Sequence, residues 1–236
     1  MIASDTITHQ REAAFHDAWA GSTPIDDVLV RECFEALTAM ENRFILSRMG
    51  DLKGKRLLDI GAGLGESSVY FALQGAQVTM TDISPGMVRT GRELARKHGV
   101  EIEGIVSQAE DLGVPAETYD FVYIANTIHH VQDRDALFQK IHRALKPGGR
   151  FLCLEFSRVE APGLDAIYER YSFSVLPKLG EWVAQDGEAY RYLAESIRRF
   201  PAQKPFATMI EKAGLSRVKV RNLTGGIAAM HSAWRI

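Results

Sequence analysis

Residues 56–88 read RLLDIGAGLGESSVYFALQGAQVTMTDISPGMV, and this stretch decides the fold class. A mostly apolar run at 57–60 leads into three alternate glycines, Gly61, Gly63 and Gly65, and then into a helix-compatible segment. A second apolar run ends at Asp82. The order of strand, glycine loop, helix, strand and acid predicts a βαβ unit that binds a nucleoside at the edge of a parallel sheet.

Each part of this unit has a physical role. Glycines let the backbone approach a ligand closely, because a Cβ there would collide with it. A carboxylate about 20 residues further on, here Asp82, can accept hydrogen bonds from both ribose hydroxyls. The spacing is G-x-G-x-G followed by Glu66, whereas a dinucleotide site favours G-x-G-x-x-G facing a pyrophosphate. An acid at this place repels a pyrophosphate and favours a ligand that carries positive charge.

Strands and helices alternate as far as residue 156, which implies parallel βαβ units. Expected strands lie at 56–60, 77–81, 102–106, 119–125 and 150–156, with helices at 65–74, 84–98 and 133–145. A last helix at 203–213 precedes strands at 216–223 and 227–235. The domain organisation that we expect is an N-terminal arm and helix (1–55), a core (56–156), a helical cap insertion (157–202), and a last helix with two strands that complete the core sheet (203–236).

The N-terminal 55 residues show a helix signal. Residues 1–22 are expected to form a mobile or loosely helical arm. The run Thr23–Pro24–Ile25–Asp26 has the residues of a helix start, with Thr23 as the N-cap. Apolar residues then follow at helical spacing and predict a single helix with one buried stripe. They are Val30, Cys33, Phe34, Leu37 and Phe44.

Three further segments follow in a characteristic order: DISPGM (82–87), YDFV (119–122) and LKPGG (145–149). With the glycine loop, they make the chain resemble the class I S-adenosylmethionine (SAM)-dependent methyltransferases. The resemblance implies a Rossmann-like α/β fold, with a seven-stranded, mostly parallel sheet, helices on both faces and an antiparallel final strand. It also implies SAM as the cofactor.

The resemblance assigns cofactor-binding residues by position, namely Asp59, Gly61, Gly63, Gly65, Asp82, Ile83, Gln108, Ala109, Glu110 and Asn126. Within this set, Asp59 is expected near the aminoacyl end, Asp82 on the ribose and Ile83 against adenine. The loop after the third strand touches the adenine edge. Gln108 stands where an aspartate is commoner, and its amide oxygen can accept a hydrogen bond from the adenine amino group.

The C-terminal part of the chain is more specific. The segments LEFS (154–157), YSFSVLPKLG (171–180), YRYLAESIRRFP (190–201) and NLTGGIAAMH (222–231) are similar to the ubiquinone/menaquinone biosynthesis C-methyltransferases, the UbiE family. That resemblance implies methylation of a ring carbon of a polyprenylated quinol. Two segments depart from it: His129–His130 replace a usual Arg-Asn pair, and FHDAWAG (15–21) replaces a tyrosine-rich signature.

Candidate catalytic and substrate residues follow from their places in the sheet. His129 and His130 lie just past the fourth strand, at the carboxyl edge where open α/β sheets bind ligands. A histidine can take a phenolic proton near neutral pH, so either is a candidate general base. Tyr168, Tyr171 and Tyr190 are candidates for an aromatic substrate pocket within the cap. Adjacent histidines cannot share one helix face, and no metal site is expected.

Composition and charge argue against several other classes of protein. The chain has 236 residues and a formal net charge of −2, which gives no electrostatic footprint for nucleic acid. Two distant cysteines, Cys33 and Cys153, fit a reducing compartment rather than a disulfide framework. We find no signal-peptide core and no apolar run near the ~20 residues that span a bilayer. We therefore expect a cytoplasmic protein with at most weak peripheral membrane contact, and the sequence leaves a homodimer open.

These observations predict a SAM-dependent methyltransferase that acts on a quinol-like or other aromatic small molecule, with ring C-methylation favoured. O- or N-methylation of another small molecule is the first alternative, and a non-methylating SAM-dependent reaction on a quinone is the second. A nicotinamide oxidoreductase and a non-catalytic scaffold with the same fold also remain as alternatives.

Overall fold

A seven-stranded sheet in the order β3-β2-β1-β4-β5-β7-β6 forms the centre of the computed structural model, which describes residues 2–157, 196 and 199–236. The strands are β1 (Arg56–Ile60), β2 (Gln77–Asp82), β3 (Glu103–Val106), β4 (Tyr119–Ala125), β5 (Leu145–Phe156), β6 (Ser216–Leu223) and β7 (Ala228–Trp234). Strands β1 to β5 run parallel, whereas β7 is antiparallel to both of its neighbours. The predicted Rossmann-like α/β class is confirmed.

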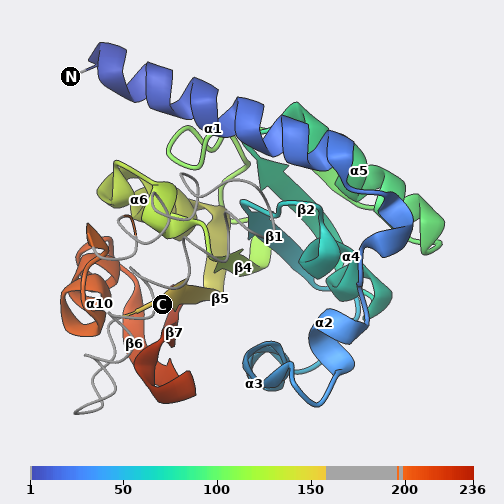
Figure 1. Ribbon diagram of the computed structural model, residues 1–236. Coiled ribbons are helices and arrows are strands. Elements are labelled where there is room, and N and C mark those ends of the chain that lie inside the picture. The colour runs from blue at the N-terminus through green and yellow to red at the C-terminus, as the bar shows by residue number, and fades with distance from the viewer. Residues whose placement is uncertain (1, 158–195, 197–198) are drawn as a thin grey trace.

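Helices cover both faces of the sheet (Figure 1). The described helices are α1 (Ile2–Ser22), α2 (Glu32–Glu35), α3 (Met40–Met49), α4 (Glu66–Leu73), α5 (Pro85–Lys97), α6 (Arg134–Ala144) and α10 (Gln203–Lys212). Helices α4 and α5 share one apolar cluster with Leu57 and Tyr123, whereas α6 and α10 share the other with Leu58 and Val122. Because the central strands are buried on both faces, their sequences are apolar almost throughout.

The N-terminal region differs from the prediction. Residues 2–22 form the regular helix α1 rather than a loose arm. The single helix expected after Thr23 is wrong, because the chain there forms a short 3-10 turn (Ile25–Asp27), α2 and α3. The Thr23 hydroxyl donates to the Trp19 carbonyl, so it closes α1 instead of starting a helix. Leu37, expected in the buried stripe, is 85% exposed because it lies in the turn between α2 and α3.

The fifth strand begins earlier than predicted. Helix α6 ends at Ala144 and β5 begins at Leu145 rather than at 150, so the LKPGG segment already belongs to the extended strand. The helical cap predicted at 157–202 lies almost entirely outside the described residues.

Helix α1 lies across the carboxyl ends of the parallel strands, above the tip of β2 and beside α5 (Figure 1). The Asp17 carboxylate accepts hydrogen bonds from Ser84 Oγ at 2.5 Å and from the Gly86 backbone N–H at 2.7 Å, at the start of α5. A Cβ at Gly86 would lie 2.7 Å from Asp17 Oδ1 and 3.3 Å from the Ala20 Cβ. The glycine therefore allows α1 to dock closely over the ligand edge of the sheet.

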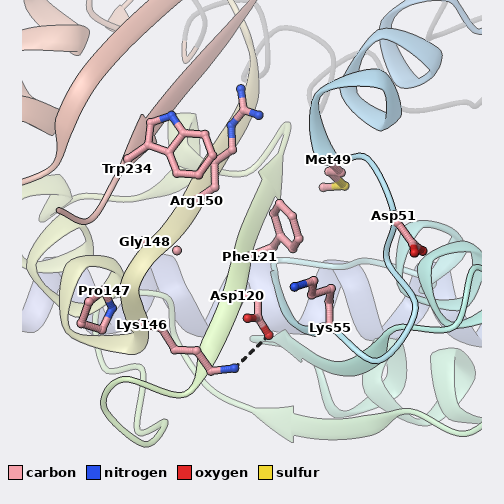
Figure 2. Close-up of a pocket in the computed structure, with 11 residues that line it drawn as sticks. Met49, Asp51, Lys55, Asp120, Phe121, Lys146, Pro147, Gly148, Arg150 and Trp234 are labelled. Atoms are coloured by element: carbon pink, nitrogen blue, oxygen red, sulfur yellow. Dashed lines mark hydrogen bonds and ion pairs between the residues drawn. The ribbon is translucent and has the colours of Figure 1, made fainter.

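The opposite, amino edge of the sheet carries a hollow of about 300 Å3 between β5, β7 and the segment that enters β1 (Figure 2). Figure 2 shows Lys55 and Lys146 approaching Asp120 from two sides, with Lys146 Nζ 2.9 Å from Asp120 Oδ2. The Arg150 guanidinium lies 4.8 Å from the centre of the Trp234 ring. Basic side chains therefore gather at this edge, where they neutralise the acid that lies among them.

Candidate functional site

The glycine loop lies between β1 and α4, and each glycine in it serves a different purpose. Gly61, Gly63 and Gly65 have φ values of +66°, +57° and +90°. A Cβ at Gly61 would collide with the Thr127 side chain, and one at Gly65 would lie 2.8 Å from the Cα of Gly91 on α5. No described atom lies within 4 Å of a Cβ built at Gly63. The loop therefore packs tightly at its two ends and leaves room for a ligand at its centre.

Asp82 ends β2 and lies beside this open point of the loop. Its Oδ2 accepts the Gly63 N–H at 3.0 Å, and its Oδ1 accepts the Ser84 N–H at 2.9 Å. Burial raises the pKa of Asp82, while these hydrogen bonds and the nearby His16 ring oppose that rise. The carboxylate is thus fixed against the glycine loop, in the position expected for a ribose acceptor.

Two more carboxyl groups surround the loop. Asp59 on β1 is buried and accepts a hydrogen bond from Ser68 Oγ at 2.7 Å. Burial raises the pKa of Asp59 to about 7, and the neighbouring Asp82 and Glu66 carboxylates add to the rise. Burial also raises the pKa of Glu66, at the start of α4. Three crowded carboxyl groups favour a ligand with positive charge, so these residues fit the sulfonium and ammonium groups of SAM.

The residues expected around adenine lie at the same edge. Ile83 directly follows Asp82 and is half-buried. The backbone N–H of Ser107 donates to the Asp82 carbonyl at 2.9 Å, which holds the loop after β3 against β2. Gln108 and Ala109 are half-buried in that loop. Ile83 and this loop can therefore form two sides of an adenine pocket.

Glu110 and Asn126 have local roles that the sequence did not indicate. The Glu110 carboxylate accepts the Gln132 backbone N–H at 2.9 Å and lies 3.9 Å from His9 on α1. Asn126 is exposed, has φ +51° and donates its backbone N–H to the Leu154 carbonyl at 2.9 Å. Asparagine tolerates this left-handed conformation better than most residues, so Asn126 shapes the loop after β4.

His129 is buried on a 3-10 turn (Ile128–His130) that follows β4. Its Nδ1 lies 2.9 Å from Oε2 of Glu155, a fully buried residue of β5. Oε1 of Glu155 accepts the backbone N–H groups of Thr127 and Ile128 at 2.5 and 2.7 Å. The Thr127 hydroxyl lies 3.2 Å from the Gly61 carbonyl oxygen, so the histidine turn abuts the glycine loop. Sequence reasoning missed Glu155, although an acid within the apolar run FLCLEF was a signal for it.

Helix α1 brings further polar groups to the histidine turn. Glu12 lies 3.3 Å from Nδ1 of His130. The rings of His129 and His130 are 4.1 Å apart between centres, and the His16 ring is 6.4 Å from that of His130. Burial lowers the pKa of His16, whereas the Asp82 carboxylate counteracts it. Glu12 and His16 were missed because nothing local in the sequence links α1 to residues more than sixty positions away.

The remaining sequence features are the cap tyrosines, possible metal ligands, the cysteines and possible membrane spans. Tyr168, Tyr171 and Tyr190 lie outside the described residues. Within the described residues, no group of three or more His, Cys, Asp or Glu side chains has metal-binding geometry. Cys33 and Cys153 are free thiols. None of the described helices is long and apolar enough to cross a membrane.

Comparison with known proteins places this chain in a family. Residues 33–235 match the ubiE/COQ5 methyltransferase family. The chain is 47% identical over 186 residues to the ubiquinone/menaquinone biosynthesis C-methyltransferase UbiE of Bartonella tribocorum, a match that covers 77% of this chain and 72% of that protein.

Solved structures share the fold. A SAM-dependent methyltransferase from Aquifex aeolicus has a TM-score of 0.64 at 18% identity, covering 93% of this chain and 98% of that one. A phosphoethanolamine N-methyltransferase 2 from Haemonchus contortus, in complex with S-adenosylhomocysteine, has a TM-score of 0.63 at 19% identity, covering 83% and 52%. From the family match and the glycine loop beside Asp82, we conclude that the chain belongs to the ubiE/COQ5 methyltransferase family and is a SAM-dependent methyltransferase.

Proposed function

We propose that this enzyme methylates a ring carbon of a quinol-type aromatic substrate, as the names of its UbiE relatives indicate for those proteins. One observation carries the proposal. His129 is buried beside the cofactor loop, with Nδ1 held by Glu155, and its Nε2 has no hydrogen-bond partner among the described residues. A buried imidazole nitrogen without a partner is poised to accept a hydrogen bond or a proton from a phenolic hydroxyl.

The carboxyl edge divides into a cofactor half and an acceptor half. In the cofactor half, we assign binding of SAM to the ten residues predicted from the sequence, which are Asp59, Gly61, Gly63, Gly65, Asp82, Ile83, Gln108, Ala109, Glu110 and Asn126. Asp82 would accept hydrogen bonds from the ribose hydroxyls, and the open space at Gly63 would receive the nucleoside. The carboxyl groups of Asp59 and Glu66 would stabilise the positively charged sulfonium and ammonium groups. Bound SAM supplies an electrophilic methyl group and a neutral thioether leaving group.

In the acceptor half, His129 raises the reactivity of the ring. A proton moves from a substrate hydroxyl to His129 Nε2, and the resulting phenolate makes the adjacent ring carbon nucleophilic. The pocket must hold that carbon about 3–3.5 Å from the methyl group. After methyl transfer, the substituted carbon of the neutral dienone gives its hydrogen as a proton to water. His129 returns its proton to the ring oxygen, so the ring regains aromaticity and the histidine is neutral again. We assign His130 to the same wall, where Glu12 of α1 orients it.

The test is incubation of the purified enzyme with SAM carrying a 13C-labelled methyl group and a demethylated quinol with a short prenyl tail. NMR of the product distinguishes a methyl on a ring carbon from one on oxygen. We expect ring methylation and a large loss of kcat in His129→Phe. A product methylated on oxygen, or a His129→Phe variant with unchanged kcat, contradicts the proposed reaction or the proposed base, respectively.

Access to a prenylated substrate involves helix α1. Phe15 and Trp19, one helical turn apart, are 49% and 47% exposed. Aromatic side chains of this kind insert into the interfacial region of a bilayer. We propose that the enzyme works in the cytosol, where its free thiols persist, and touches the membrane weakly through α1. Co-sedimentation with anionic lipid vesicles tests this, since a Phe15→Ser/Trp19→Ser variant should lose whatever binding the native chain shows.

A further inference from the structure

Glu155 is a charged residue in the interior of the sheet. It is fully buried in β5, where its Cα pairs with that of Ala229 on β7. Among the described residues, four donors surround its carboxylate: the backbone N–H groups of Thr127, Ile128 and Phe156, and the His129 ring. An isolated carboxylate in this position would be costly, and these hydrogen bonds offset its loss of hydration. The acid is therefore built into the fold.

The hydrogen bonds that the two carboxylate oxygens of Glu155 accept determine which ring nitrogen of His129 carries the hydrogen. Oε1 receives two backbone N–H groups, which cannot act as acceptors. Oε2 faces His129 Nδ1 at 2.9 Å, so a neutral ring must carry its hydrogen on Nδ1 in order to donate to the carboxylate. The lone pair of that tautomer is then on Nε2, the nitrogen without a partner among the described residues.

Other titratable groups lie around Glu155, on neighbouring elements. Arg134 at the start of α6 and His231 on β7 both interact electrostatically with its carboxylate, as does the Cys153 thiol on β5. The Arg134 Nε donates to the Ile128 carbonyl at 3.3 Å, so it braces the same turn from the other side. His231 has its own hydrogen bond to the Gln203 carbonyl. Of the side chains that the structure describes, the His129 ring is the titratable group that lies 2.9 Å from the carboxylate.

We propose that Glu155 is a positioning residue that holds His129 in the Nδ1-protonated tautomer, so that Nε2 is the base of the methyl-transfer reaction. When the substrate proton arrives on Nε2, the ring becomes an imidazolium whose charge is stabilised by the Glu155 carboxylate at Nδ1. That the proton comes from a phenolic substrate rests on the proposed function. The assignment of the His129 tautomer is independent of the substrate.

The tautomer can be measured without substrate. Long-range 1H–15N NMR of protein labelled at histidine separates rings protonated on Nδ1, on Nε2 or on both, and a His129→Phe variant identifies the resonance. We expect the His129 ring at pH 8 to carry its proton on Nδ1. A ring protonated on Nε2 alone overturns the proposal, whatever the activity of the enzyme.

The kinetic test uses Glu155→Gln, which is nearly isosteric. Its amide oxygen should face Thr127 and Ile128, because two backbone N–H groups donate to Oε1 whereas only that of Phe156 donates to Oε2. The NH2 group then faces His129 Nδ1 and forces the hydrogen onto Nε2. With the base thus blocked, we expect kcat to fall about 10²- to 10⁴-fold with the KM for SAM little changed. Glu155→Asp keeps the charge and should restore part of the lost kcat.

A matched control is Cys153→Ala, which alters the same buried face of β5 two residues earlier and should retain kcat within about threefold. A Glu155→Gln enzyme with native kcat overturns the proposal even if ring methylation by the native enzyme is confirmed. If the native enzyme methylates no quinol while NMR finds the Nδ1 tautomer, the proposed function fails and the positioning role stands. If Glu155→Gln does not fold, the NMR result on the native chain decides.

Discussion

Asp59 and Asp120 belong to neighbouring parallel strands, yet they lie at opposite edges of the sheet and have opposite electrostatic environments. At the carboxyl edge, Asp59 shares a hydrogen bond with a neutral serine and burial raises its pKa to about 7. At the amino edge, burial also acts to raise the pKa of Asp120, but hydrogen bonds from the Arg56 backbone and Lys146 outweigh it and lower the pKa. The acid at the amino edge is thus neutralised by lysine, whereas the acid at the carboxyl edge is crowded by other acids.

This contrast supports the proposed cofactor site at the carboxyl edge. An acid that already has a cation beside it gains little from a second, whereas crowded carboxylates are stabilised by any cation that enters. The hollow at the amino edge (Figure 2) is lined by three cations, Lys55, Lys146 and Arg150, and by two acids, Asp51 and Asp120, so cations outnumber acids there. The local charge therefore favours the carboxyl edge as the proposed site for SAM, as does the space that the glycine loop leaves.

The largest expected effect comes from removing the proposed ribose acceptor. Asp82→Ala should weaken SAM binding by about 10²- to 10⁴-fold, because two hydrogen bonds to a charged acceptor are lost at about 1.5–3 kcal/mol each. Isothermal titration calorimetry measures this. Asp120→Asn, the matched change at the amino edge, should leave the Kd for SAM within about twofold, and equal losses in the two variants would contradict the contrast between edges.

Alanine substitutions at two glycines distinguish the cost of backbone strain from the cost of a steric collision. Gly65 at the carboxyl edge and Gly99 before β3 both have positive φ, but only a Cβ at Gly65 meets another backbone, that of Gly91. Gly99→Ala should lower the free energy of unfolding by about 1–2 kcal/mol through strain alone. Gly65→Ala should cost at least about 1 kcal/mol more, because α4 and α5 must move apart. Urea denaturation of both variants gives the comparison, and equal losses would show that the close packing is unimportant.

The raised pKa of Asp59 predicts a pH dependence of cofactor binding. Below pH 7 the free enzyme holds Asp59 protonated and neutral, and above pH 7 the group is ionised. Because a cation binds the ionised form better, SAM affinity should rise with pH between about 6 and 8, by less than tenfold per unit. Titrations across this range should show the rise in the native enzyme and a flatter profile in Asp59→Asn. A profile that falls with pH would contradict the assignment.

The smallest effect concerns the docking of α1. Asp17→Asn weakens the hydrogen bonds to Ser84 and Gly86, so SAM should dissociate about threefold to tenfold faster while the fold persists. Stopped-flow fluorescence from Trp19 on α1 can follow release. The control is Asp26→Asn, which removes an exposed ion pair to Lys97 at the far end of α5 and should leave the rate unchanged. A slower release in Asp17→Asn would show that α1 does not retain the cofactor.

The sequence predicts contacts between residues that are close along the chain better than contacts between residues that are far apart. The close approach of the glycine loop and Asp82 was predicted because Gly61, Gly65 and Asp82 lie within one βαβ unit, where local order implies spatial order. Glu155 was missed because it meets His129 only through the pairing of β4 with β5, across 26 positions. Glu12 required the docking of α1, which no local pattern encodes.

The errors at the N-terminus have a similar cause. Leu37 fits a helical period, but a period cannot show that the chain turns after four residues of α2. Thr23 has the side chain of an N-cap, yet its hydroxyl turns back to the Trp19 carbonyl and ends the preceding helix. The same hydroxyl serves either end of a helix, and tertiary packing determines which one it serves.

The strand order has a consequence for biosynthesis of the enzyme. Strand β7 is the last of the sheet in chain order, but it inserts between β5 and β6 instead of joining at the edge. While β7 is still inside the ribosome, β5, which carries Glu155, has an unpaired edge, and such edges recruit other strands. Newly made chains therefore pass through an aggregation-prone stage until β7 has emerged, and chaperone binding should concentrate on chains arrested before residue 228.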